Sequence, residues 1–331
     1  METEKSTKNI DPAGPSILVV GTGAIGSFYG GKLAQAGARV SVVCRSDYET
    51  IKAHGIRVAS PLGDFHFQPE KILHEASEYG AVPDYILVGM KVLPEVNTAE
   101  IIRGAVGPET AIVLIQNGVE IEEPVALAFP HNEIVSGLAY IAVSRTAPGE
   151  ILHQQYGRLT LGLYPSGDSA KVQRLACLLP ASGIPCEVTS EVVSARWQKL
   201  VWNAPFNPIS VLGGAVDTRV ILSSEESVDL VRKVMEEVCL AAKAAGHELP
   251  PSVVQQNIDG TKAMKPYKPS MLLDYEGKRP MEVEAILGNA VRAARRLSVP
   301  VPHLETLYAL LQLVDEGNRS RVSEAPCHHP D

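Results

Sequence analysis

The sequence has few cysteines and no long apolar run, and each shortage argues against a class of protein. Its five cysteines are odd in number, widely spread and without a Cys-x-x-Cys pair, so they suggest neither a disulfide framework nor a zinc site. This pattern favours a reducing, cytoplasmic location. No stretch of about 18 apolar residues occurs, and the N-terminus lacks the apolar core of a signal peptide. We therefore expect no membrane partner.

Positive charge is also in short supply, since 30 Lys and Arg face 38 Asp and Glu, for a net charge of -8. This balance argues against nucleic acid as a partner, although a local pocket for a small anion is compatible with it. Cys327-His328-His329 places three possible ligands together. Without a partner cluster elsewhere, we expect no metal site there.

The 331 residues are enough for two domains. Short apolar runs alternate with helical patterns in the first half, which predicts a parallel α/β sheet of Rossmann type. The expected strands are 17–20, 39–43, 85–88, 111–115, 134–143, 150–155 and 158–163. Turns at Pro148-Gly149 and Tyr156-Gly157 would make the last three antiparallel edge strands.

Longer helical patterns follow, so the second half is predicted to be all-α. The expected helices are 192–203, 226–245, 281–297 and 303–313. The expected organisation is a disordered extension (1–15), a Rossmann domain (16–189), a helical substrate domain (190–317) and a disordered tail (318–331). The join between the domains should leave a cleft, where small-molecule sites are common.

A Gly-x-Gly-x-x-Gly sequence directly follows the first strand and opens a helix. It runs Gly21-Thr22-Gly23-Ala24-Ile25-Gly26. Gly21 would make a tight turn, Gly23 would let a pyrophosphate approach the backbone, and Gly26 would pack the helix on the strand. The free amides of the helix N-terminus favour phosphate. This context predicts dinucleotide binding.

A P-loop is the rival phosphate site, because Gly26, Gly31 and Lys32 fit Gly-x4-Gly-Lys. It fails at Leu33, where a hydroxyl should hold magnesium. The second strand ends with Arg45 and a hydroxyl, where an NAD enzyme would carry a carboxylate. A guanidinium can take the 2'-phosphate of NADP, which makes NADP (NADPH) the expected cofactor.

Polar residues also follow two further strands. Lys91 comes after the strand at 85–88, and Asn117 comes after the strand at 111–115. Ligands of such sheets lie beyond the carboxyl ends of the strands. Each residue has a plain alternative, since Lys91 could face solvent and Asn117-Gly118 could be a simple turn.

An ammonium and two carboxamides recur every fourth residue between Trp197 and Pro208. Lys199, Asn203 and Asn207 would share one helix face. Asn is a poor helix former, so this face is predicted to grip a polar ligand, with a solvated stripe as the alternative. Pro205 removes a backbone donor and should kink or break the helix, so we expect the shared face to bend before Asn207.

Together these segments resemble the ketopantoate reductase (2-dehydropantoate 2-reductase) family over about residues 17–313. Ser270-Met271-Leu272, Glu282 and the segments around Arg296 and Glu305 extend the resemblance. It implies a Rossmann-type domain, a C-terminal domain like that of 6-phosphogluconate dehydrogenase, and NADPH-dependent reduction of 2-dehydropantoate to (R)-pantoate in pantothenate biosynthesis.

The resemblance also implies residue roles. Lys199 matches the general acid, Asn203 and Asn207 match residues that bind the substrate oxygens, and Ser270 matches the group that holds its carboxylate. Glu282 matches the acceptor of its terminal hydroxyl. Asn117 and Lys91 match cleft residues near the nicotinamide ribose and the reacting carbon.

Simpler interpretations exist for three of these residues, and Met281 departs from the family. Lys199 could be an exposed helix lysine, Ser270 an N-cap and Glu282 a first-turn glutamate. Met281 stands where a threonine is usual. Two alternatives to pantoate formation are the same chemistry on another 2-keto acid and a non-catalytic NADP(H) sensor. A monomer or a homodimer is expected.

Overall fold

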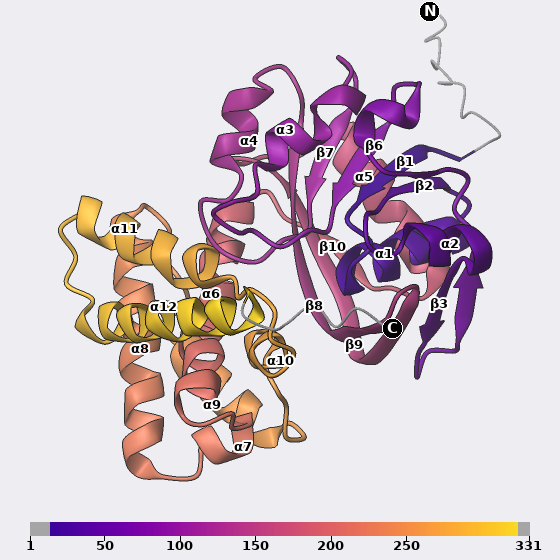
Figure 1. Cartoon of the computed structure of the whole chain (residues 1–331). Coiled ribbons are helices and arrows are strands. Elements are labelled where there is room, and N and C mark those ends of the chain that lie inside the picture. Colours follow the sequence, from indigo (N-terminus) through magenta and orange to yellow (C-terminus); the bar gives the residue numbers. More distant parts are fainter. Residues whose placement is uncertain (1–13, 324–331) are drawn as a thin grey trace, which may run out of the picture.

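The computed structural model describes residues 14–323, which form an α/β domain followed by a helical domain (Figure 1). The sheet has the strand order β4-β3-β9-β8-β7-β6-β1-β2-β5, with β10 beside β9. Its strands are β1 (Ser16–Val20), β2 (Arg39–Val43), β3 (Ile56–Ala59), β4 (Phe65–Phe67), β5 (Ile72–Leu73), β6 (Tyr85–Val88), β7 (Ala111–Leu114), β8 (Ile134–Ala147), β9 (Glu150–Leu163) and β10 (Cys186–Val188).

Strands β1, β2, β6 and β7 are mutually parallel, so the segments that follow them emerge at one edge of the sheet. Their side chains alternate between two apolar layers: Ile17 and Val19 pack on one face, and Leu18 and Val20 pack on the other. Burial on both faces explains why these strands are continuously apolar. This edge collects the residues that the sequence placed after each strand.

Helices cover both faces of the sheet. Helices α1 and α5 pack on the face of Ile17, whereas α3 and α4 pack on the face of Leu18. The helices of this domain are α1 (Ala24–Gln35), α2 (Tyr48–His54), η1 (Ala76–Tyr79), α3 (Thr98–Ile102), η2 (Arg103–Ala105), α4 (Glu123–Ala128), α5 (Ala170–Leu178) and η3 (Leu179–Ser182). The predicted Rossmann-type layering is therefore confirmed.

The hairpin of β8 and β9 differs from the prediction. Pro148-Gly149 is the expected turn, but β9 continues through Tyr156-Gly157, where both residues have positive φ and the register with β8 shifts. A bulge of this kind bends a strand without ending it. Strand β3 pairs with β9, so the expectation of edge strands is also wrong for this hairpin.

The second domain is helical, as predicted, and α6 lies at its centre (Figure 1). Its elements are α6 (Val192–Leu212), α7 (Thr218–Ile221), α8 (Glu225–Ala244), α9 (Val253–Ala263), α10 (Ser270–Glu276), the π-helical turn η4 (Glu284–Gly288), α11 (Asn289–Arg296) and α12 (Pro302–Ser323). Within residues 14–323, we find no helix with the length and apolar character that crossing a membrane requires.

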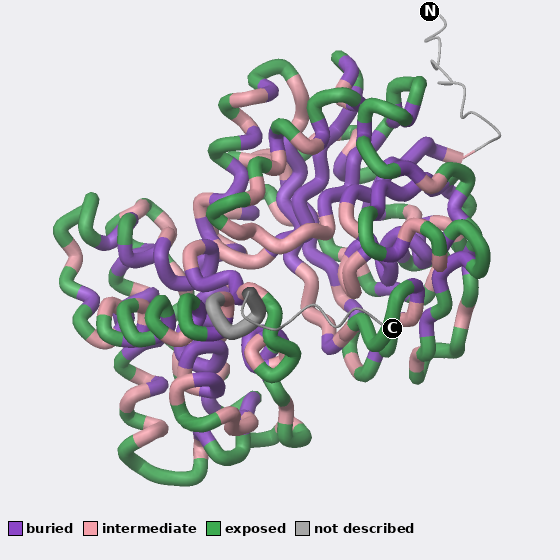
Figure 2. Tube along the Cα trace, viewed as in Figure 1, coloured by how far each residue is buried: buried purple, intermediate pink, exposed green. Residues whose placement is uncertain are grey.

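Helix α6 does not break at Pro205, so of the predicted kink or break the break does not occur. It continues for 21 residues and contains Pro208 as well. Pro205, Phe206 and Pro208 are all buried, and Figure 2 shows the helix within the buried part of this domain. A proline costs about 3 kcal/mol inside a helix, and here the packing of the surrounding helices compensates for the missing donors.

The end of the second domain also lies further along the chain than expected. Helix α12 continues to Ser323, past the predicted start of the tail at residue 318, and the Asn318 amide donates to the Arg279 carbonyl. The candidate ligands Cys327, His328 and His329 lie outside the described residues, as does most of the N-terminal extension. In residues 14–323, no group of three or more His, Cys, Asp or Glu side chains could hold a metal ion.

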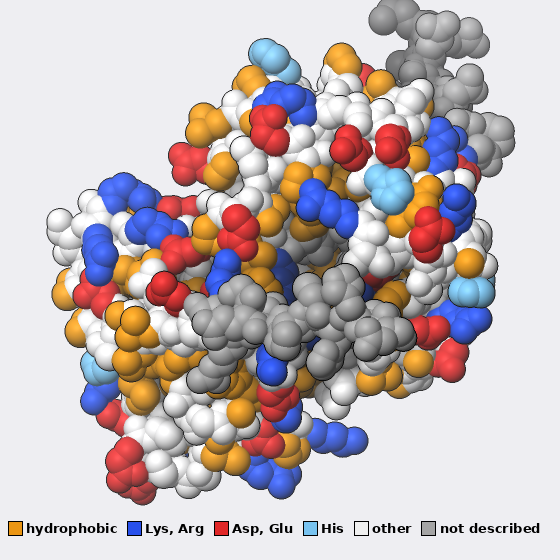
Figure 3. Space-filling view, in the orientation of Figure 1, with side chains coloured by type: hydrophobic (Ala, Val, Ile, Leu, Met, Phe, Trp, Pro, Cys, Tyr) orange, Lys and Arg blue, Asp and Glu red, His pale blue; other side chains and the backbone are white. Residues whose placement is uncertain are grey.

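Basic and acidic side chains lie side by side over both domains on the face drawn in Figure 3. Ion pairs among the described residues include Arg292 with Glu284 and Arg295 with Glu305. Charges of both signs are therefore interspersed on this face.

Candidate active site

Two glycines of the loop after β1, Gly21 and Gly26, have the backbone and packing tasks that the sequence assigned to them. Gly21 has φ +94°, and a Cβ there would lie 2.5 Å from Met90 Cγ. A Cβ at Gly26 would lie 2.0 Å from the Gly21 carbonyl oxygen. Only glycine fits either position. The loop is therefore held tightly between β1, the start of α1 and the segment after β6.

The backbone at Gly23, by contrast, faces open space. The nearest atom to a Cβ there would be the Gly89 oxygen at 4.0 Å. Helix α1 begins at Ala24 without a side-chain cap and without an acidic residue in its first turn. Its free amides and positive dipole end are thus available to a phosphate group. Thr22 and Ile25 complete a loop that fits the pyrophosphate of a dinucleotide.

Lys32 takes no part in this loop, which agrees with the rejection of a P-loop. It is buried within α1, and its Nζ donates to Gln35 Oε1 at 3.0 Å. A Cβ at Gly31 would collide with the rings of Phe65 and Phe67, and one at Gly30 would lie 3.0 Å from a Val19 methyl group. These two glycines allow α1 to pack closely on its neighbours.

Arg45 lies just beyond β2, exposed, at the same edge of the sheet. Its guanidinium forms no hydrogen bond or ion pair with any other residue that the structure describes. Asp47, the nearest carboxylate after β2, is buried and paired with Arg145 at 2.8 Å. The charge available beside the loop is therefore positive, as NADP requires.

Lys199 projects from α6 toward the end of β7. Its Nζ donates to Asn117 Oδ1 at 2.9 Å and to the Ala139 carbonyl of β8 at 2.7 Å. The side chain is half-buried, because it also lines a cavity. The alternative of an exposed helix lysine does not apply.

The surroundings of Lys199 make its ammonium unusually acidic. Burial and, after it, the charge of Arg196 lower the pKa of Lys199 from 10.5 to about 7, while the charge of Glu282 opposes the change. A proton donor works best when its pKa is near the working pH. Lys199 thus has the proton affinity that a general acid needs.

Asn117 joins Lys199 to Glu282. Its oxygen accepts from Lys199, which leaves its amide nitrogen to donate toward the Glu282 carboxylate. Glu282 is buried immediately before the helical segment of η4, and its Oε1 accepts from the Val92 backbone N–H at 3.0 Å. Burial raises the pKa of Glu282, while the Val92 N–H, Lys91 and Asn117 hold it down.

Gly118 is more than part of a turn. It has φ +105°, and a Cβ there would lie 2.3 Å from the carbonyl oxygen of Ala285 in η4. The loop that carries Asn117 can approach the second domain this closely only because residue 118 is glycine. This contact brings Asn117 and Glu282 within reach of each other.

Lys91 spans the two domains instead of facing solvent. Its Nζ lies 2.7 Å from Asp274 Oδ1 in α10 and donates to the Pro280 carbonyl at 3.0 Å. Asp274, which the sequence analysis missed, is buried and also pairs with Arg279. The Lys91 ammonium therefore lies beside Glu282, where it favours the ionised form of that carboxyl group.

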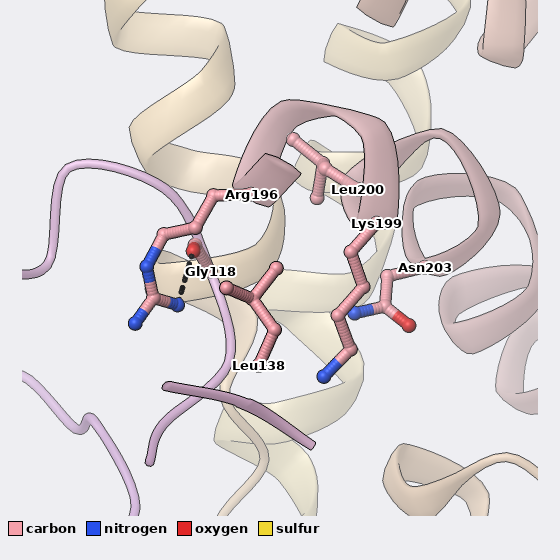
Figure 4. Close-up of a pocket in the computed structure, with 6 residues that line it drawn as sticks. All are labelled: Gly118, Leu138, Arg196, Lys199, Leu200 and Asn203. Atoms are coloured by element: carbon pink, nitrogen blue, oxygen red, sulfur yellow. Dashed lines mark hydrogen bonds between the residues drawn. The ribbon is translucent and has the colours of Figure 1, made fainter. Parts of the chain in front are cut away.

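A small cavity of about 10 Å³ lies where α6 meets the loop after β7. Figure 4 shows Lys199 and Asn203 on one side of α6, with Arg196 directed away toward Gly118. The Asn203 carboxamide has no hydrogen-bond partner among residues 14–323. Polar groups that lack a protein partner and line a cavity are suited to hold a ligand.

Asn207 is not among the residues that line this cavity. It is buried, its Oδ1 accepts from the Met271 backbone N–H at 3.3 Å, and its amide donates to the Asn203 carbonyl. It therefore fixes the start of α10, where Ser270 is the first residue. Ser270 is exposed and gives no side-chain cap to its helix, so its hydroxyl is available to a ligand.

The comparisons with known proteins cover both domains. The family model described as "Ketopantoate reductase PanE/ApbA" matches residues 17–166, and "Ketopantoate reductase PanE/ApbA C terminal" matches residues 191–315. The chain is 34% identical to a 2-dehydropantoate 2-reductase of Nostoc sp., over 91% of this chain and 96% of that relative.

Two solved structures agree with this result. The 2-dehydropantoate 2-reductase of Methylococcus capsulatus is 53% identical, with a TM-score of 0.87, over 92% of this chain and 98% of that chain. The enzyme of Geobacter metallireducens is 35% identical, with a TM-score of 0.85, over 90% of this chain and 99% of that chain. The predicted resemblance is thus confirmed over nearly the whole chain.

Proposed function

The chain belongs to the ketopantoate reductase family, and we propose that it reduces 2-dehydropantoate to (R)-pantoate with NADPH. The observation that carries this proposal is the Lys199 ammonium, which lines a cavity beside the loop after β7 and has a pKa of about 7. A redox sensor would have no use for a proton donor at this place. Reduction of a ketone needs one.

NADPH supplies a hydride when it is bound. Gly21, Gly23 and Gly26 would hold its pyrophosphate on the amides of α1, and Arg45 would pair with its 2'-phosphate. Lys199 then gives a proton to the ketone oxygen, on which negative charge develops. General acid catalysis of this kind contributes about 10²- to 10⁴-fold to the rate.

The remaining polar groups suit the substrate. Asn203 offers an unpaired carboxamide to its oxygens, and Ser270 offers a hydroxyl to its carboxylate. Glu282 would accept from the terminal hydroxyl, while Asn117 and Lys91 would lie beside the nicotinamide ribose and the reacting carbon. We assign Asn207 a supporting part in this scheme, because both of its polar atoms are already bonded to protein.

The location and assembly are part of the same proposal. We infer that the protein works in the cytoplasm, as a monomer or a homodimer and without nucleic acid. The net charge of -8 and the absence of a cysteine framework support this.

NADPH consumption tests the proposal directly. The wild-type protein should oxidise NADPH with 2-dehydropantoate faster than with 2-ketoisovalerate or pyruvate. Lys199→Met should lower kcat by about 10²- to 10⁴-fold and leave NADPH binding, followed by nucleotide fluorescence, within about threefold of wild type. NADPH binding without turnover on any of these acids would favour the sensor.

A further inference from the structure

Arg196 is a fully buried arginine that the proposed chemistry does not use. Its side chain is 2% exposed, and it leaves α6 one helical turn before Lys199, pointing into the first domain (Figure 4). A buried guanidinium is costly unless its donors are satisfied. Its partners therefore indicate what it does.

Those partners surround the loop after β7. One Nη donates to the Gln116 carbonyl at 2.7 Å and to the Gly118 carbonyl at 3.1 Å, so Arg196 grips the backbone on both sides of Asn117. Its Nε contacts Glu122 and donates to Ser136 Oγ at 2.8 Å. Glu122 is 1% exposed and forms an ion pair with the guanidinium.

This arrangement connects the guanidinium to the proposed proton donor through Asn117. The Asn117 oxygen can accept from Lys199 only while the backbone at 116 and 118 stays in place. A lysine at position 196 would keep the positive charge. It would lack the planar fork that serves several acceptors at once.

We propose that Arg196 is a positioning residue that fixes the loop 116–118 and thereby holds Asn117 against the Lys199 ammonium. This assignment rests on the proposed reductase function. Arg196 lines the cavity beside Lys199 and Asn203, but its hydrogen bonds all go to protein groups, so it acts through Asn117 and through its charge.

Other charged groups face Lys199 as well. Glu282 precedes η4, and its charge favours the protonated amine, while Tyr140 of β8 presents its ring to the ammonium. Lys91 and Asp274 lie beside Glu282. Arg196 is the cation that acts against protonation of Lys199, so the removal of its charge should raise the pKa of Lys199.

Two variants separate the effect of Arg196 on the position of the loop 116–118 from the effect of its charge on Lys199. Arg196→Lys keeps the cation opposite Glu122 but cannot hold both carbonyls. It should lower kcat by roughly 10- to 100-fold and leave the KM for NADPH within about threefold of the wild-type value. The midpoint of the pH profile of kcat should stay where it is in the wild type. The double variant Arg196→Gln/Glu122→Gln removes both charges, and the midpoint of its pH profile should rise, because Arg196 and not Glu122 is among the charges that act on Lys199.

Arg296→Lys is the matched control, since Arg296 also pairs across the domains, with Glu120, but contacts neither carbonyl. It should keep the wild-type kcat. Wild-type kcat in Arg196→Lys, or an unmoved midpoint in the double variant, would overturn the proposal.

A readout that does not need turnover keeps this test separate from the proposed function. The ¹³Cε signal of Lys199, assigned by its loss in Lys199→Met, can be titrated in the wild type and in the double variant. A higher midpoint in the double variant supports the role of Arg196 even if 2-dehydropantoate is not the substrate. Equal midpoints contradict that role, whereas a wild-type protein that fails to oxidise NADPH contradicts only the reductase.

Discussion

A lysine ammonium that ordinarily loses its proton near pH 10.5 becomes a usable acid at neutral pH once Lys199 is desolvated beside a second cation. The protonated form is the one that donates to a ketone oxygen. The free amine is the one that accepts a proton from an alcohol. The two directions of the reaction should therefore depend on pH with opposite signs.

We expect kcat/KM for ketone reduction to be constant below about pH 7 and to fall about tenfold per pH unit above it, because Lys199 loses its proton there. For pantoate oxidation by NADP⁺, kcat/KM should instead rise up to about pH 7 and then level off. Steady-state rates in both directions over a shared set of buffers would measure this. Profiles that fall in the same direction would show that Lys199 is not the titrating group.

Arg45 decides the choice of nucleotide in our interpretation, since no other described residue engages its guanidinium. Arg45→Ala should lower kcat/KM for NADPH by about 10- to 100-fold, which corresponds to the loss of a charged hydrogen bond. The kcat/KM for NADH should stay within about threefold of the wild-type value. Equal losses with both nucleotides would mean that Arg45 supports the loop and does not read the phosphate.

Helix α6 shows how one element divides its residues between binding and stability. Asn203 and Asn207 are four residues apart on the same helix, yet one faces the cavity and the other is bonded to the start of α10. The helix is enclosed on several sides, so neighbouring turns meet different surroundings. Spacing alone groups these two residues together, whereas packing separates them.

Asn203 and Asn207 provide a matched pair of variants. Asn207→Ala leaves the buried Met271 N–H without its acceptor and should lower the free energy of unfolding by about 1–3 kcal/mol. Asn203→Ala breaks no side-chain bond within the described protein, so stability should hardly change, while kcat/KM should fall. Denaturant unfolding and steady-state kinetics on both variants measure the difference. Equal destabilisation by the two changes would contradict this division.

The sequence predicted most of the regular elements and failed where tertiary packing decides. The apolar strands at 39–43 and 85–88 were predicted with the bounds that the structure has. Pro205 and the Tyr156-Gly157 bulge were misinterpreted, because local rules treat proline and glycine as breaks while the surrounding contacts override them. Burial explains the rest: nothing in the spacing indicated that Arg196, one turn before Lys199, would be enclosed.

Over the whole molecule, the candidate site exists only because two independent cores meet. The cores exchange single residues at their contact: Val119 packs with the helical domain, and Ala285 packs with the sheet. Glu282 comes from the second domain and is held by the Val92 N–H of the first. Substrate selection should therefore depend on a carboxylate that neither domain could position alone.

Glu282→Gln tests this dependence. The carboxylate would accept from the terminal hydroxyl of 2-dehydropantoate, and a charged hydrogen bond contributes about 1.5–3 kcal/mol. We therefore expect kcat/KM for 2-dehydropantoate to fall by roughly 10- to 100-fold. The value for 2-ketoisovalerate, which lacks that hydroxyl, should fall much less. Glu282 also favours protonation of Lys199, so any loss in proton transfer should lower kcat/KM for both substrates equally. Only the ratio of the two kcat/KM values therefore reports recognition of the hydroxyl. An unchanged ratio would assign Glu282 to Lys199 alone and point to another 2-keto acid as the natural substrate.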